Sequence, residues 1–243
     1  CKCDEGKAQD YKTLPRRYGQ QVQVVYCGSS RRSVGKGGFP QIRGSVAVEK
    51  LWNAILYTSR VIDKDGNPLD PIAEWDKHNA SFEEKCKVLN SLDLVCLEYK
   101  SSNGTDLKVG LMEQGSFLGG GEYTLGKHEY FNPNIPTEEV FTTPKAGECE
   151  GIVYSSMPLS YNGEIIDNFS LRFEGGRVVE ALAEKNQELL REMVGMDEGA
   201  ARLGECAFVP YNSPIRNSGI MFYETLFDEN AACHLAFGEG FAE

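Results

Sequence analysis

Three segments of the sequence hold side chains that could bind a metal ion, and the first contains two adjacent glutamates. Glu138 and Glu139 lie between Pro136 and Pro144. Because proline fixes its own φ and restricts the residue before it, we expect extended backbone here. Adjacent side chains of an extended segment point in opposite directions, so one glutamate can enter a site while the other faces solvent. For this motif alone, two surface glutamates are the better interpretation.

The second segment places a single carboxylate at the start of an apolar run. Glu205 precedes Cys206-Ala207-Phe208-Val209. A lone carboxylate is costly to bury unless it is paired or bound to a metal ion. A charge at the end of a strand that reaches water is an equally good interpretation of Glu205.

The third segment, from Asp228 to His234, is the strongest of the three because it lies between an aromatic-rich run and further apolar residues. A carboxylate and an imidazole in such surroundings are typical ligands of first-row metals. Glu229 and His234 are five positions apart, so on a regular helix their directions would differ by roughly 140°. They can share a centre only if the helix bends or if they serve two ions. A histidine bonded to backbone is the alternative.

Other chemistries find less support. The sequence has three histidines, and none accompanies a G-x-S-x-G motif or a similar nucleophile. The Gly28 to Gly38 stretch lacks the spacing of a phosphate loop, and Gly37 stands where serine or threonine is needed, so we predict a surface loop. The net charge of −11 argues against nonspecific binding to nucleic acid.

The sequence also predicts neither a membrane partner nor a disulfide framework. No apolar run approaches the ~20 residues that cross a bilayer. Eight cysteines are scattered without a CxxC pair, and several lie in apolar runs such as Leu94–Leu97. Such cysteines favour buried, reduced thiols in a cytoplasmic protein.

The elements that must position these residues fall into two parts. Residues 1–80 are predicted to be helix-rich, and apolar residues recur at helical spacing from Val46 to Ser59. Asp70-Pro71 is a plausible N-cap with a first-turn proline. Ser81-x-x-Glu84 has the form of a capping box that opens a second helix, which runs to about Asn90.

Residues 81–243 are predicted to be strand-rich. Turn residues predict two hairpins, and a helical pattern covers Glu184–Val194. The whole pattern predicts an α+β fold in which a helix-rich N-terminal part precedes a mixed, largely antiparallel domain, with a boundary near residue 80. The predicted hairpin strands are Leu92–Tyr99 with Asp106–Leu111 and Phe169–Phe173 with Arg177–Leu182, and further short strands are predicted over Gln21–Tyr26, Gly204–Pro210 and Ile220–Phe227.

The three chemistry-bearing segments together resemble signature blocks of the aminopeptidase T and aminopeptidase S family. The blocks run from Ile135 to Pro144, from Arg202 to Pro210 and from Thr225 to Ala236, in the order of the family. The resemblance implies a metal-dependent aminopeptidase with two divalent ions, such as zinc or cobalt. It also implies peptide substrates with a free N-terminus and a cytoplasmic homodimer.

Carried over, the resemblance implies that Glu139, Glu205, Glu229 and His234 are metal ligands. It selects Glu139 over Glu138, so we expect Glu138 to point away from the centre, to be the more exposed of the pair and to tolerate substitution. Glu205 is also the candidate catalytic residue, because a ligand carboxylate can change its coordination and accept a proton. In such a centre the ions lower the pKa of a shared water toward neutrality.

Two departures from the family pattern limit this expectation. The family supplies two more ligands from a His-x-Asp pair that lies further along than Glu243, and a tyrosine of the family is replaced here by Phe241. We therefore expect a piece of a longer protein, in which residues 1–80 are the remnant of an N-terminal domain. This chain alone is expected to be metal-poor and inactive. The alternative is a non-catalytic scaffold domain that kept the fold.

Overall fold

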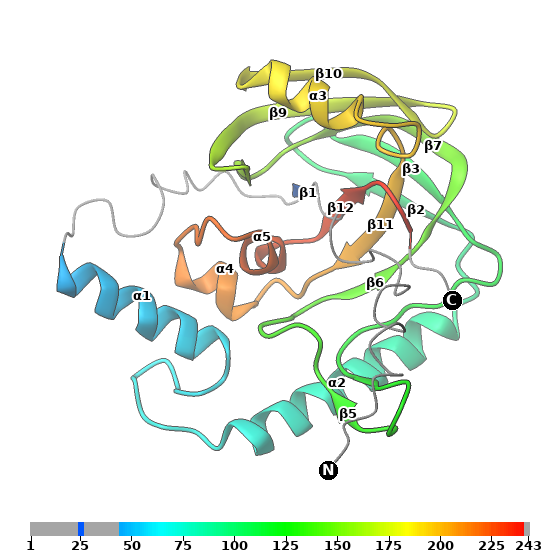
Figure 1. Cartoon of the computed structure of the whole chain (residues 1–243). Coiled ribbons are helices and arrows are strands. Elements are labelled where there is room, and N and C mark those ends of the chain that lie inside the picture. The colour runs from blue at the N-terminus through cyan, green and yellow to red at the C-terminus, as the bar shows by residue number, and fades with distance from the viewer. Residues whose placement is uncertain (1–23, 27–43, 241–243) are drawn as a thin grey trace, which may run out of the picture.

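The computed structural model describes residues 24–26 and 44–240, in which helices come first and antiparallel strands follow (Figure 1). This order confirms the predicted α+β class. None of the described helices combines the length and the apolar character needed to cross a membrane. The helices are α1 (Ser45–Thr58), α2 (Pro71–Asn90), α3 (Gln187–Val194), α4 (Pro214–Ser218), α5 (Thr225–Asp228) and the 3-10 turn η2 (Glu229–Ala231).

Helix α2 begins where the sequence predicts, but it is a single helix. The Asp70 carboxylate accepts hydrogen bonds from the amides of Ile72 and Ala73, and Pro71 occupies the first turn. The second helix start predicted at Ser81 is wrong. Trp75, His78 and Phe82 are buried at helical spacing on both sides of that point, and their packing keeps the helix continuous. Residue 80 lies inside α2, and the division into two domains stays a prediction.

A six-stranded antiparallel sheet forms the upper layer in Figure 1. Both predicted hairpins are confirmed, since β2 pairs with β3 and β9 pairs with β10. The strands lie in the order β10-β9-β7-β3-β2, with β8 on β9, and comprise β2 (Cys96–Lys100), β3 (Asp106–Leu111), β7 (Pro144–Tyr154), β8 (Leu159–Tyr161), β9 (Glu164–Glu174) and β10 (Arg177–Lys185).

A four-stranded antiparallel sheet in the order β1-β12-β11-β6 carries the candidate site. Its β1 and β11 confirm predicted strands, while residues 21–23 and the predicted loop from Gly28 to Gly38 lie outside the described residues. A separate small hairpin joins β4 and β5. These strands are β1 (Val24–Tyr26), β6 (Val140–Thr142), β11 (Leu203–Phe208), β12 (His234–Phe237), β4 (Glu122–Tyr123) and β5 (Tyr130–Phe131).

Two predicted elements need correction. The strand expected over Ile220–Phe227 is wrong, because Glu224 caps a helical turn: its carboxylate accepts from the Leu226 amide at 2.9 Å, and α5 follows. Helix α3 begins at Gln187 rather than at Glu184. Residues 184–185 continue β10, and Asn186 adopts a left-handed conformation that separates strand from helix.

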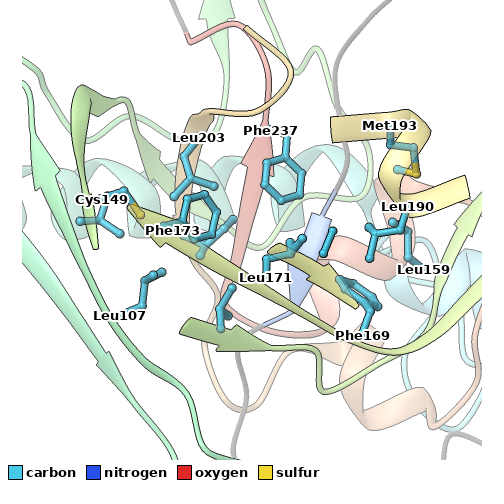
Figure 2. Close-up of a cluster of buried hydrophobic side chains, with 14 of the residues drawn as sticks. Leu107, Cys149, Leu159, Phe169, Leu171, Phe173, Leu190, Met193, Leu203 and Phe237 are labelled. Carbon is cyan, nitrogen blue, oxygen red and sulfur yellow. The ribbon is translucent and has the colours of Figure 1, made fainter. Parts of the chain in front are cut away.

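The main hydrophobic core lies between the two sheets and helix α3 (Figure 2). Leu107, Phe173 and Leu190 contribute from the six-stranded sheet and α3, and Cys206 and Leu235 contribute from β11 and β12. Because side chains alternate along a strand, the face of β11 and β12 turned away from this core holds their other residues. That second face is where the candidate site lies.

Candidate metal centre

Strands β11 and β12 place Glu205 and His234 on the same face of the four-stranded sheet. Glu205 pairs with Ala236, and Ala207 pairs with His234. Residues that pair across antiparallel strands share a face, and so do residues two apart on one strand, so Glu205 and His234 are diagonal neighbours. The flanking Cys206 and Leu235 face the core instead.

A β-bulge at Gly204 makes this arrangement possible. The pairing register of β11 and β12 shifts between Leu203 and Glu205. The extra residue lets Leu203 and Cys206 both face the core while Glu205 turns to the opposite face. A Cβ atom at position 204 would collide with the Glu239 carbonyl, so only glycine fits the bulge.

Glu139 enters the same face from the other side of β11. It directly precedes β6, in which Phe141 pairs with Ala207. Glu139 and Phe141 are two residues apart and therefore share the face of Ala207 and His234. Ala207 lies on β11, between β12 and β6. Its small side chain lets the longer side chains of Glu139 and His234 meet above it.

The three side chains form a compact buried donor set. One ligand atom each of Glu139, Glu205 and His234 lies within 4.8 Å of the others. Glu139 Oε2 and His234 Nε2 are 3.0 Å apart, and neither atom completes a hydrogen bond. Two ligand atoms bonded to one first-row ion at about 2.0–2.2 Å lie at a similar separation. Buried polar atoms without hydrogen bonds are rare, and a cation between them would satisfy both.

The ring orientation of His234 also suits a metal ligand. Its Nδ1 lies 3.1 Å from the Ala232 carbonyl. A carbonyl oxygen only accepts, so Nδ1 carries a proton and donates it. In the neutral ring this leaves the Nε2 lone pair directed at Glu139, which is the tautomer that a metal ligand needs.

Glu229 reaches the vicinity of this cluster because the chain changes conformation before His234. Glu229 begins the 3-10 turn η2, and Ala232 is already extended, with φ −156° and ψ 164°. The helical divergence expected from their spacing therefore does not apply. Glu229 is buried, and its carboxylate interacts electrostatically with Glu139, His234 and Glu205. It lies outside the closest group of three donors.

The electrostatics of the cluster are those of carboxylates crowded in a buried place. Burial and the Glu139 charge raise the pKa of Glu205 to about 7, and the same two causes raise the pKa of Glu229 well above its ordinary value. Burial alone would lower the pKa of His234, but Glu139, Glu229 and Glu205 outweigh it and raise that pKa to about 10. The protonated His234 supplies one positive charge among three carboxylates, and a divalent cation would compensate the rest.

Glu138 is where the expectation from sequence is wrong in part. Its carboxylate pairs with Arg60 and is not part of the group of Glu139, Glu205 and His234. It is not the more exposed of the pair, however, since Glu138 is 4% and Glu139 5% exposed. The guanidinium of Arg60 compensates the negative charge of Glu138, so this carboxylate can be buried without contact with water.

Three residues beside the centre were not predicted from the sequence: Arg60, His78 and Asn230. Arg60 Nη2 donates to Glu138 Oε1, and Asn230 Oδ1 accepts from the Glu138 amide at 2.7 Å. Burial, with a further contribution from Arg60, lowers the pKa of His78 to about 4. Arg60 and Glu138 are 78 positions apart, and no local motif marks the contact.

Comparisons with known proteins place the chain among metalloproteases. A sequence profile of the family described as thermophilic metalloprotease (M29) matches residues 6–243. Aminopeptidase T of Thermus aquaticus is 44% identical over 208 residues, which are 86% of this chain and 49% of that protein. Aminopeptidase AmpS of Bacillus subtilis (strain 168) is 44% identical over 229 residues, 93% of this chain and 54% of that protein.

The fold comparison gives the same result. The structure of wild-type AmpT from Thermus thermophilus superposes with a TM-score of 0.74 at 44% identity, covering 83% of this chain and 48% of that one. The chain therefore spans about half the length of the curated relatives it matches.

Proposed function

The chain belongs to the thermophilic metalloprotease (M29) family, and from this premise we propose that it carries the metal-binding part of an aminopeptidase that releases N-terminal amino acids from peptides. The observation that supports this proposal best is the pair of buried atoms Glu139 Oε2 and His234 Nε2, 3.0 Å apart without a hydrogen bond. A carboxylate oxygen and an imidazole nitrogen at this separation suit two ligands of one cation.

Glu139, Glu205, Glu229 and His234 would hold two divalent ions, of which zinc and cobalt suit mixed carboxylate and imidazole donors. Glu139, Glu205 and His234 form the tightest group, and Glu229 would complete the second position. When bound, the ions would supply an activated water and polarise the first peptide carbonyl.

Glu205 is the residue we propose for proton transfer. Hydrolysis adds the hydroxyl of a water to the carbonyl carbon, breaks the peptide C–N bond and leaves a proton for the departing amine. Glu205 is one of the three clustered donors and would carry that proton from water to amine. His234 would remain fixed as a ligand by its bond to the Ala232 carbonyl.

The test combines metal analysis with a peptidase assay on the complete native protein. We expect about two zinc or cobalt ions per chain, together with release of N-terminal residues from unblocked peptides. Glu139→Gln should abolish release and reduce the bound metal. Glu198→Gln is the matched control, because Glu198 has an 88% exposed side chain in α3's following loop and should change neither.

Two outcomes separate the alternatives. Tightly bound metal without peptide hydrolysis would favour the non-catalytic scaffold. The phenylalanine at position 241, where the family pattern has a tyrosine, also supports that alternative. A wild-type protein that holds no metal would overturn the proposed centre.

A further inference from the structure

Residues 137 and 138, just before the proposed ligand Glu139, are held by side chains from three other parts of the chain. Arg60 Nη2 donates to Glu138 Oε1 at 2.5 Å. His78 Nε2 lies 2.9 Å from the Thr137 carbonyl, which can only accept, so the ring donates this bond. The Glu138 amide donates to Asn230 Oδ1 at 2.7 Å.

These contacts replace a β ladder. Strand β6 begins only at Val140, and within the described part of the chain no strand pairs with residues 137–139. Paired strands set the directions of the Glu205 and His234 side chains. Glu139 lies outside any paired strand, so its direction is not set in this way. Because Glu138 and Glu139 are joined by one peptide bond, anchoring the side chain and amide of Glu138 restrains the backbone that carries Glu139.

We propose that Arg60 and Glu138 are positioning residues that aim Glu139 into the metal centre. The proposal rests on the proposed metal-binding function. Arg60 is itself held in place: its guanidinium carbon lies 6.0 Å from the centre of the Trp75 ring, and Trp75 Nε1 donates to the Ser59 carbonyl at 3.0 Å. The turn after α1 and helix α2 thus support Glu138.

The same network reaches a second proposed ligand. Asn230 directly follows Glu229, and its Nδ2 donates to the Leu226 carbonyl at 2.9 Å. The Asn230 carbonyl accepts from Ser213 Oγ at 2.6 Å. Asn230 Oδ1 also accepts a hydrogen bond from the Glu138 amide. This bond connects the segment of Glu139 to the segment of Glu229.

The sign of the effect on metal affinity distinguishes positioning from through-space electrostatics. Arg60 is a positive charge close to a centre that would hold cations. By Coulomb's law alone, its removal would leave metal affinity unchanged or increase it. If Arg60 acts by aiming Glu139, its removal must decrease that affinity.

The experiment measures the dissociation constant for zinc on the metal-free, complete native protein, by competition with a chromophoric chelator. Arg60→Gln should raise the constant about tenfold or more, the usual effect of losing a side chain that orients a metal ligand. Arg60→Lys should give a smaller increase, because a lysine keeps the charge but cannot reproduce the guanidinium geometry. Arg191→Gln, which breaks the exposed pair with Glu188 on α3, is the control and should match the wild type.

The outcomes are separable. Wild-type protein that binds no zinc would overturn the metal centre and this inference with it. If the wild type binds zinc while both Arg60 variants bind it equally well or more tightly, the centre stands and the positioning role is wrong. Circular dichroism checks that each variant is folded, and if Arg60→Gln does not fold, Arg60→Lys decides alone.

Discussion

His234 has no exposed surface and stands among the carboxylates of Glu139, Glu205 and Glu229. Burying several charges without compensation costs far more than any hydrogen bond returns. The protein can meet this cost by binding protons or by binding metal. Proton binding and metal binding therefore compete at the same atoms, which makes the metal-free protein sensitive to pH.

We expect the free energy of unfolding of the metal-free protein to fall as pH rises from 6.5 to 8. The pKa of Glu205 is raised from 4.5 to about 7, and that of His234 from 6.5 to about 10, so the folded state holds protons that the unfolded chain has released. Stability from groups with raised pKa values is lost as pH increases through them. His78 acts in the opposite direction, but its pKa of about 4 confines its effect to pH values below 6.5.

Urea unfolding of the metal-free protein at pH 6.5 and pH 8 measures this change. Glu205→Gln removes one titrating group and should flatten the dependence. Saturating zinc should also reduce it, because metal ions compete better with protons at higher pH. A metal-free protein that is equally stable or more stable at pH 8 would contradict the assignment.

At the scale of elements, the start of β6 depends on a close approach by Gly119. A Cβ atom at position 119 would lie 2.7 Å from the Glu139 carbonyl oxygen and 3.3 Å from Phe82. Gly119→Ala must therefore displace the backbone at Glu139. We expect a loss of about 1–3 kcal/mol in the free energy of unfolding, together with weaker zinc binding.

Gly126→Ala is the matched control for this substitution. Nothing lies within 4 Å of a Cβ atom at Gly126, and its φ is not in the left-handed region. Its effect on the free energy of unfolding should stay within about 0.5 kcal/mol. Thermal or urea unfolding of both variants checks the prediction, and equal effects would show that the contact at Glu139 is not restrictive.

The elements that the sequence predicts well are those whose signals are local. Helical spacing locates α1, and the glycine turn after Glu174 locates the β9–β10 hairpin. Three-residue β6 is too short to show a period. The separation of Glu229 and His234 suggests a bent helix, whereas the chain is extended at Ala232 and forms β12 from His234 onward.

The same distinction applies to the site. The resemblance selects Glu139 over Glu138 because the separations between the carried-over ligands match those of the family, and the choice stays a prediction. The sequence does not reveal the role of Arg60, because its contact with Glu138 spans 78 positions and leaves no local pattern. The burial of Glu138 was missed for the same reason: its compensating charge lies in a distant segment.

At the scale of the whole molecule, the chain covers about half of its relatives, and this affects the expected metal content. Four donors shared by two ions give about two protein ligands each, below the three that catalytic zinc sites use. We expect residues 1–243 alone to hold fewer than two ions and to release N-terminal residues at least about tenfold more slowly than the complete native protein.

Elemental analysis beside a peptidase assay with added zinc or cobalt tests this expectation. Two tightly held ions and undiminished turnover in residues 1–243 would contradict it. The cytoplasmic location and the homodimer stay predictions from the resemblance.

Strands β12 and β11 occupy the two interior positions of the sheet order β1-β12-β11-β6; the backbone of His234 is paired with Tyr26 on one side and Ala207 on the other, and Glu205 is paired with Ala236. Fraying at a sheet edge does not reach them, and they separate only when a larger unit of the structure opens. An ion held there by the proposed ligands would then leave through such openings rather than by the loss of one ligand bond. We expect slow metal exchange, more than high affinity, from this position in the sheet.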